Sequence, residues 1–399
     1  MIHRLLTALF IGLLLAACGD DDPPPPEPVE TPAESAAETP EQATDDPIEE
    51  ARAKIDAEGL LAHIETLASD EFGGREPMTE GERLTLDYLE TRFRELGLQP
   101  LFGDSYRQPV PLVSIDPGDA APLAVRLPGG DVHAFEYGPE VMLWTSRMVD
   151  SIELDDSELV FVGYGIVAPE YDWNDYEGMD VSGKTVVMLV NDPGFATGDP
   201  ALFNGRAMTY YGRWTYKYEE AARQGAAGAL IIHQAAPASY GWNVVEDSNK
   251  GPQFHLASED QNMGRVKIEG WLQYPVAKDI FALARQDLDR LIERAAEGPV
   301  TPVPLGITAS TRFTNRLQRA ESFNIGAVVP GSERPDELFV YMAHWDHIGT
   351  ADGGAPGEDL IYNGAEDNAS GTAGLLELAE AFMTPGLEPE RSVGFLAVT

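Results

Sequence analysis

The amino-acid sequence predicts an α/β protein in which a parallel-type mixed sheet with covering helices is interrupted by a β-rich module. Three observations lead to this fold class. Two stretches between residues 48 and 98 carry apolar side chains at helical spacing, and the middle of the chain alternates short apolar runs with turns. From residue 322 onward the pattern reads strand, strand, helix, strand, which is typical of a parallel αβ unit.

Length and charge limit the classes of function. The chain has 399 residues, enough for two or more domains that each bury a core. It carries 27 basic and 67 acidic residues, a net charge of −40, which argues against nucleic acid as a partner. The acidic surface suits salty surroundings, where screening weakens self-repulsion. Attraction of cationic substrates and divalent metals is the alternative reading.

The first residues have the features of a targeting signal. Arg4 precedes the apolar stretch 5–17, which is too short to span a bilayer comfortably. It ends in "LAAC", and Cys18 is the only cysteine of the chain. The pattern resembles a bacterial lipoprotein signal (1–17), which implies lipidation of Cys18 and a lipid anchor on the periplasmic or extracellular side of the bacterial cell envelope. An ordinary signal peptide or membrane anchor is the alternative.

An acidic, proline-rich segment follows the cysteine. Residues 18–50 contain almost nothing apolar to bury, so we expect a disordered tether that holds the folded part away from a membrane. With Cys18 used as an anchor, no thiol remains for a disulfide, a nucleophile or a metal ligand. Any metal site must therefore be built from His, Asp and Glu.

Two helices are expected at the start of the folded part, over residues 48–70 and 81–98. Apolar residues recur three or four apart in both, and Gly97 is placed to end the second. His63 lies off the apolar stripe of the first helix, so we interpret it as a surface histidine. Both helices are expected to cover a sheet.

The middle of the chain predicts the β-rich module. Residues 158–195 contain two apolar runs around a polar loop, and residues 216–234 read as a helix, a break at Gly225 and a buried strand. The stretches "VGYGI", "GKTVVMLV" and "GAAGALI" resemble the protease-associated domain, over roughly 150–255 of an insertion spanning 114–317. In relatives that module shapes substrate access or partner contacts and does no chemistry. His233 is interpreted as structural.

The last part of the chain carries the candidate site. Strands are expected at 322–331, 336–344 and 391–399, with a loop and helix over 363–382. Reactive groups of parallel sheets sit at the carboxyl ends of strands, where His344 falls. His344 and Asp346 are two residues apart and would point to the same side in an extended chain. Asp346 could then hold one ring nitrogen while the other binds a metal.

Each of these residues also has a simpler explanation. His344 and Asp346 could only be polar residues that end a strand, and Asp367 could only cap the helix that follows it. Together, however, "AHWDHIG" and "NGAEDNASGTAGLLELA" resemble the co-catalytic zinc aminopeptidase family, which includes glutamate carboxypeptidase and the transferrin receptor. The segments 67–100 and 322–337 also fit that family, which places its peptidase domain at 51–113 and 318–399.

The resemblance implies a site with two zinc ions and peptide substrates. His344 would bind one metal, and Asp367 would bridge both metals. Asp346 would belong to the catalytic machinery because it would orient the His344 ring. The bond after Asp367 is often cis in the family. A metal-activated water, helped by a glutamate, would release N-terminal residues. His347 follows a pattern common among relatives, but no role is assigned to it.

The sequence departs from the family pattern at its end. In the family, the strand resembling "VGFLAVT" runs into a pair of glutamates, the general base and a zinc ligand, and an Asp and a His ligand follow. None of these occurs before Thr399, and no histidine follows His347. We therefore expect a fragment of a longer lipoprotein zinc aminopeptidase, inactive by itself. The alternatives are a non-catalytic binding protein on the same fold, and a carboxypeptidase or dipeptidase of the same family.

Overall fold

The structure is a computed structural model that describes residues 46–118, 120–351 and 357–399. The predicted signal peptide, Cys18 and most of the tether lie outside the described residues. Within them, no helix has the length and apolar character needed to cross a membrane. Residues 47–50, which we assigned to the tether, are instead the first turn of a helix, because Asp46 caps the Ile48 amide and proline occupies the first helical position.

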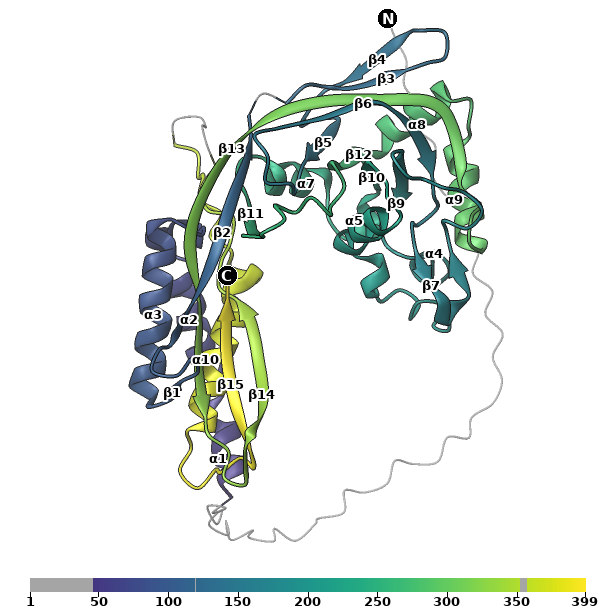
Figure 1. Ribbon diagram of the computed structural model, residues 1–399. Helices are drawn as coiled ribbons and strands as arrows, with labels where there is room; N and C mark the ends of the chain where they lie inside the picture. Colours follow the sequence, from purple (N-terminus) through teal and green to yellow (C-terminus); the bar gives the residue numbers. More distant parts are fainter. Residues whose placement is uncertain (1–45, 119, 352–356) are drawn as a thin grey trace, which may run out of the picture. The chain divides into compact units, whose positions relative to one another are not determined.

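The helices and strands are shown in Figure 1. The α-helices are α1 (Pro47–Lys54), α2 (Ala57–Leu67), α3 (Glu80–Leu96), α4 (Pro193–Thr197), α5 (Trp214–Arg223), α6 (Ala235–Ala238), α7 (Trp242–Asn249), α8 (Tyr274–Leu283), α9 (Leu288–Glu297) and α10 (Ser370–Phe382). Short helical turns are η1 (Asp70–Arg75), η2 (Pro169–Tyr171), η3 (Tyr210–Gly212) and the π-helical η4 (Ala365–Ala369).

The strands are β1 (Gln99–Pro100), β2 (Arg107–Pro117), β3 (Leu123–Arg126), β4 (Val132–Phe135), β5 (Val141–Trp144), β6 (Ser151–Phe161), β7 (Val167–Ala168), β8 (Trp173–Asn174), β9 (Thr185–Leu189), β10 (Gly228–His233), β11 (Gln253–Leu256), β12 (Ile268–Gln273), β13 (Val303–Val329), β14 (Arg334–His344) and β15 (Arg391–Val398). All but β7 and β8 join one mixed sheet. The predicted α/β fold class with a mixed sheet is confirmed.

A single long strand, β13, connects the two parts of this sheet. Its first half pairs with β3 and β6, its second half with β2, and its end with β1 and β15. The sequence predicted only the last part of this strand, from residue 322. The longer strand follows from the alternation of buried Leu305, Ile307 and Ala309 with more exposed neighbours, a period of two that fits one buried face.

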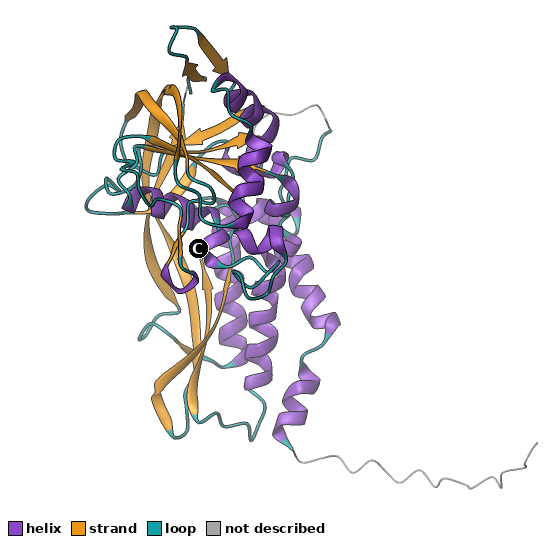
Figure 2. Cartoon of the chain, turned by 90° about the vertical axis from the view of Figure 1, so that its right-hand side faces the viewer, coloured by secondary structure: helices purple, strands orange, loops and turns teal. Residues whose placement is uncertain are grey.

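The predicted αβ unit at the end of the chain is present. β14 and β15 pair in parallel, α10 connects them, and β15 lies between β14 and β13. Helices α3 and α10 cover one face of these strands, so that Phe93, Leu376 and Phe395 share a core. Figure 2 shows helices packed beside strands in this way. On the opposite face of β14, Leu338 and Met342 are 47% and 66% exposed.

The middle of the chain forms a second core around the parallel strands β6, β9, β10 and β12. The predicted helix, break and buried strand over 216–234 are found as α5, Gly225 with a positive φ of 77°, and the fully buried β10. His233 is buried beside Tyr240, and its Nε2 lies 3.1 Å from the Tyr240 carbonyl oxygen, in agreement with a structural role.

The helix predicted over 81–98 is confirmed as α3, whereas the one predicted over 48–70 is two helices, α1 and α2, because Ile55 and Asp56 are extended. The placement of His63 was wrong. The stretches at 48–70 and 81–98 contain α1, α2 and α3, and Gly97 ends α3 with a φ of 82°. His63 is only 9% exposed. Its Nδ1 lies 2.6 Å from the Tyr88 hydroxyl and its Nε2 lies 3.9 Å from Glu377, partners on other helices that the spacing within α2 does not reveal.

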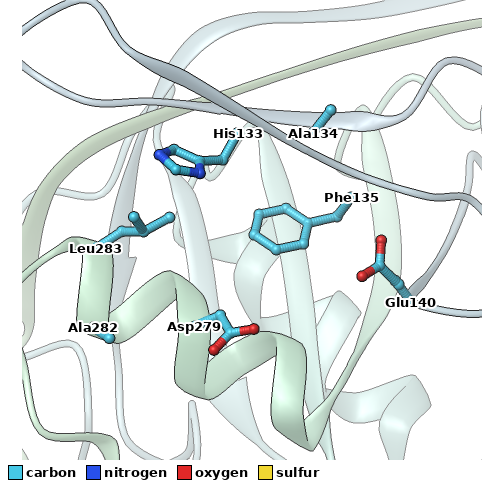
Figure 3. A pocket seen from close by; sticks show the side chains of 7 residues that line it. All are labelled: His133, Ala134, Phe135, Glu140, Asp279, Ala282 and Leu283. Carbon is cyan, nitrogen blue, oxygen red and sulfur yellow. The ribbon is translucent and has the colours of Figure 1, made fainter.

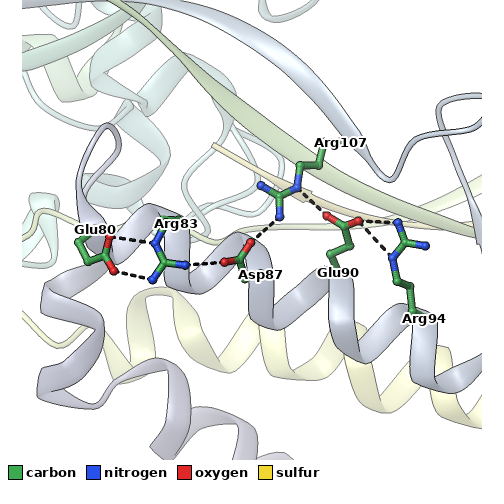
Figure 4. Close-up of polar contacts among 6 residues, drawn as sticks. All are labelled: Glu80, Arg83, Asp87, Glu90, Arg94 and Arg107. Atoms are coloured by element: carbon green, nitrogen blue, oxygen red, sulfur yellow. Dashed lines mark hydrogen bonds and ion pairs between the residues drawn. The ribbon is translucent and has the colours of Figure 1, made fainter.

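A row of alternating charges runs along α3 and ties it to β2 (Figure 4). The Arg107 guanidinium, at the start of β2, bonds Asp87 at 2.7 Å and Glu90 at 2.6 Å. Arg94 also bonds Glu90, at 2.6 Å, whereas the partners of Arg83 among the described residues belong to its own helix. Arg107 is the member of the row that connects two elements.

We expect Arg107→Ala to lower the free energy of unfolding by about 1 kcal/mol, because it removes two ion pairs of a partly shielded network. Urea unfolding at low and high salt measures this loss, which should shrink as salt screens the charges. Arg83→Ala is the matched control on the exposed side of α3. Equal losses for both variants would contradict a connecting role for Arg107.

His255 on β11 makes stability depend on pH. Its Nε2 is buried without a hydrogen-bond partner in the part of the chain that the structure describes. Burial, with the nearby Arg265, lowers the pKa of His255 to about 4. The unfolded chain binds the proton near pH 6.5, so the stability that His255 confers is complete above pH 6.5 and is lost as the pH falls towards 4.

When the pH is lowered from 7 to 5, protonation of His255 in the unfolded chain should reduce the free energy of unfolding by about 2 kcal/mol. His255→Phe, which cannot be protonated, should show a correspondingly smaller loss over the same range. Urea denaturation at several pH values provides the comparison, with His133→Phe at an exposed position as control. Parallel profiles for wild type and His255→Phe would refute the assignment.

Candidate metal centre

The candidate site begins where β14 ends. The parallel pairing of β14 with β15 reaches His344 and Val398, and the Trp345 amide then donates to the Val398 carbonyl at 2.9 Å. The Trp345 side chain is completely buried and its Nε1 donates to the Phe323 carbonyl at 3.0 Å. This anchor fixes the main chain between His344 and Asp346.

Asp367 comes from the turn that opens α10. Gly364 begins η4 with a φ of 60°, and the bond between Asp367 and Asn368 is cis, as the resemblance implied. The Asn368 side chain accepts a hydrogen bond from the Gly371 amide at 3.1 Å. Asn368, and not Asp367, therefore caps the first turn of α10. The Asp367 carboxylate is left to face His344.

The structure brings the predicted site residues together. His344 Nε2 lies 3.1 Å from Asp367 Oδ1. His344 Nδ1 lies 3.1 Å from the main-chain oxygen of Asp346 and 3.4 Å from its Oδ1, so Asp346 faces the other side of the ring. Its hydrogen bond to Asp346 raises the pKa of His344, although burial opposes this. The arrangement orients one ring nitrogen towards a carboxylate oxygen.

Both side chains open into a cavity of about 800 Å³. The His344 ring is 43% exposed and the Asp367 carboxylate 72% exposed, so both can reach a ligand there. His347, to which the sequence assigned no role, also lines the cavity. The lining also includes Asp247 and Lys250, from the segment that resembles the protease-associated domain.

Among the described residues, no group of three or more His, Cys, Asp and Glu side chains could hold a metal ion. His344 and Asp367 therefore form a pair and not a complete metal site within the described ranges. A second cavity, of about 470 Å³ between β4 and α8, contains His133, Glu140 and Asp279. Figure 3 shows these side chains spread around the cavity without a common point.

Sequence reasoning missed Arg75, which is completely buried beneath the site. Its guanidinium donates hydrogen bonds to main-chain oxygens on both loops that carry the candidate ligands. It stands in "EFGGREP", inside a stretch that resembles the family, and this charged residue after two glycines was the available signal.

The candidate site lies in a part of the chain that matches a known protein family. Residues 324–399, which contain His344, Asp346 and Asp367, match the family described as Peptidase family M28. This match agrees with the family resemblance seen in the sequence. No curated protein matches the chain.

Solved structures resemble the chain at low similarity. They include an aminopeptidase from Aneurinibacillus sp. strain AM-1 (18% identity, TM-score 0.44, 88% of this chain and 64% of that one). A peptidase M28 precursor from Shewanella amazonensis SB2B (16%, 0.42, 88% and 66%) and a zinc aminopeptidase from Bacillus subtilis (15%, 0.33, 86% and 61%) are also similar. The chain thus spans less than two thirds of each of their lengths.

Proposed function

We propose that this chain is part of a zinc-dependent exopeptidase that releases N-terminal residues from peptides. The observation that carries the proposal is the 3.1 Å approach of His344 Nε2 to Asp367 Oδ1, at a cavity and inside the segment that matches Peptidase family M28. An imidazole nitrogen and a carboxylate oxygen are ligands that zinc takes in catalytic sites. The two side chains therefore fit one part of such a site.

Each residue has a distinct task in this proposal. His344 would hold zinc with its imidazole, and Asp367, the residue to which the family resemblance gives a bridging role, would hold zinc with its carboxylate. Asp346 keeps the imidazole in one orientation by facing Nδ1, as carboxylates do behind metal-bound histidines. Bound zinc would supply an activated water and polarise the scissile carbonyl.

The remaining ligands and the general-base glutamate would come from polypeptide outside the described residues. Two observations support this. In the part of the chain that the structure describes, no group of three or more His, Cys, Asp and Glu side chains could hold a metal ion. The face of β14 that bears Leu338 and Met342 is apolar and exposed, and such a face is usually covered by further structure. The chain alone is then expected to be inactive.

The proposed substrate is a peptide, as the match to Peptidase family M28 suggests. The cavity is lined by His344 and Asp367 together with Asn243, Asp247 and Lys250. The predicted protease-associated module would thus form part of the substrate cleft. We further propose that Cys18, outside the described residues, carries a lipid that anchors the protein in a bacterial cell envelope.

The test uses the full-length protein and peptides with free or blocked N-termini. We expect hydrolysis of free peptides only, loss of activity with a chelator, and recovery with zinc. His344→Ala should lower kcat/KM more than about a hundredfold, because a catalytic metal contributes several kcal/mol. His133→Ala is the matched control at an exposed histidine and should keep full activity.

Other outcomes separate the alternatives. Cleavage of N-terminally blocked peptides from the other end would favour a carboxypeptidase, and cleavage of dipeptides only would favour a dipeptidase. Peptide binding without turnover would favour a non-catalytic binding protein. Full activity in the presence of a chelator, or in His344→Ala, would remove the metal proposal.

A further inference from the structure

Arg75 binds four main-chain oxygens with one buried side chain. Its Nε donates to the Trp345 carbonyl at 2.9 Å, and its Nη1 donates to the carbonyls of Leu67 and Asn363 at 2.6 and 2.7 Å. Its Nη2 donates to the Gly364 carbonyl at 2.8 Å. One guanidinium therefore connects the end of α2 with two loops that lie 270 residues or more further along the chain.

These acceptors are next to the candidate metal ligands. Trp345 stands between His344 and Asp346, and Gly364 begins the turn that places Asp367. The guanidinium is a rigid planar fork, so its bonded carbonyls are held at fixed relative positions. Fixing these carbonyls fixes the distance between the loop of His344 and the loop of Asp367.

Close packing around Arg75 leaves little freedom for another arrangement. A Cβ added at Gly364 would lie 2.7 Å from Arg75 Nη2, and one at Gly74 would lie 2.3 Å from the Gly349 carbonyl oxygen. The Arg75 carbonyl also accepts from the His347 amide at 3.3 Å. The segment before Arg75 is thus packed directly against the loop that follows His344.

The positive charge of Arg75 is offset by hydrogen bonds to carbonyl groups. Burial lowers its pKa to about 10, while Asp346 and Asp367 favour the charged form, so Arg75 stays positive at neutral pH. Within the described ranges it forms no ion pair with a carboxylate at contact distance. A buried cation needs hydrogen-bond partners to offset its lost hydration, and here all four partners are carbonyls.

We propose that Arg75 is a positioning residue for the candidate metal ligands His344 and Asp367. It sets the separation of these two side chains through the carbonyls of their loops. The inference rests on the proposed function. Arg75 has no exposed surface and does not line the cavity, so it acts through these loops and not by contact with a substrate.

Arg75→Lys in the full-length protein tests the inference, because lysine keeps the charge but cannot bond several carbonyls in one plane. We expect zinc affinity, measured by competition with a chromogenic chelator, to fall roughly 10–100-fold, as it does when residues behind metal ligands are changed. The visible absorption spectrum of the cobalt-substituted protein should change, and kcat should fall with little change in KM. Arg83→Lys, at an exposed arginine of α3, is the control without these effects.

The outcomes distinguish this inference from the proposed function. If wild type neither binds zinc nor cleaves peptides, the proposed function fails. If wild type does both and Arg75→Lys has the same zinc affinity and cobalt spectrum, only the positioning role is wrong.

Should Arg75→Lys not fold, Arg75→Ala is refolded with added methylguanidinium or with ammonium. Recovery of zinc affinity with methylguanidinium alone supports the role of the fork. Failure to fold under all conditions shows a general structural role and overturns the inference.

Discussion

The main chain around Trp345 is the point on which the candidate site depends, because three different elements bind it. The Trp345 amide continues the pairing with β15 through the Val398 carbonyl. The His344 carbonyl accepts from Thr372 of α10 at 2.9 Å, and the Trp345 carbonyl accepts from Arg75. A strand end normally leaves such groups to water, whereas here each is bonded by the protein. The ends of the sheet, the helix and the N-terminal segment must therefore be in place before His344 can face Asp367.

Much of this arrangement could be predicted because the signals are local. The spacing of apolar residues in α2 and α3, and the order of β14, α10 and β15, follow from periodicity within single elements. The approach of His344 to Asp367 was also predictable, since a strand end and the start of the next helix meet at one edge of a parallel sheet. The family resemblance then selected the metal interpretation over strand ends and helix caps.

The features that sequence reasoning missed depend on partners far away in the chain. His63 was assigned to the surface because the spacing of apolar residues in α2 does not reveal its contacts with Tyr88 and Glu377 on other helices. Arg75 is a stronger case, since its acceptors are main-chain oxygens, and every residue type offers the same carbonyl group. No pattern of side chains identifies such an acceptor, so only the folded structure shows why an arginine is buried at this position.

A comparison of two buried cations shows what is particular to Arg75. Lys217, in the middle of the chain, is also completely buried and bonded to carbonyl oxygens, but the buried carboxylates of Asp175 and Asp192 balance its charge. That charge is compensated within its own core. The carboxylates that favour the charged form of Arg75 are instead those of Asp346 and Asp367 in the candidate site. The N-terminal segment and the loops of the candidate site are therefore connected through one guanidinium, by the hydrogen bonds that it donates to their carbonyls.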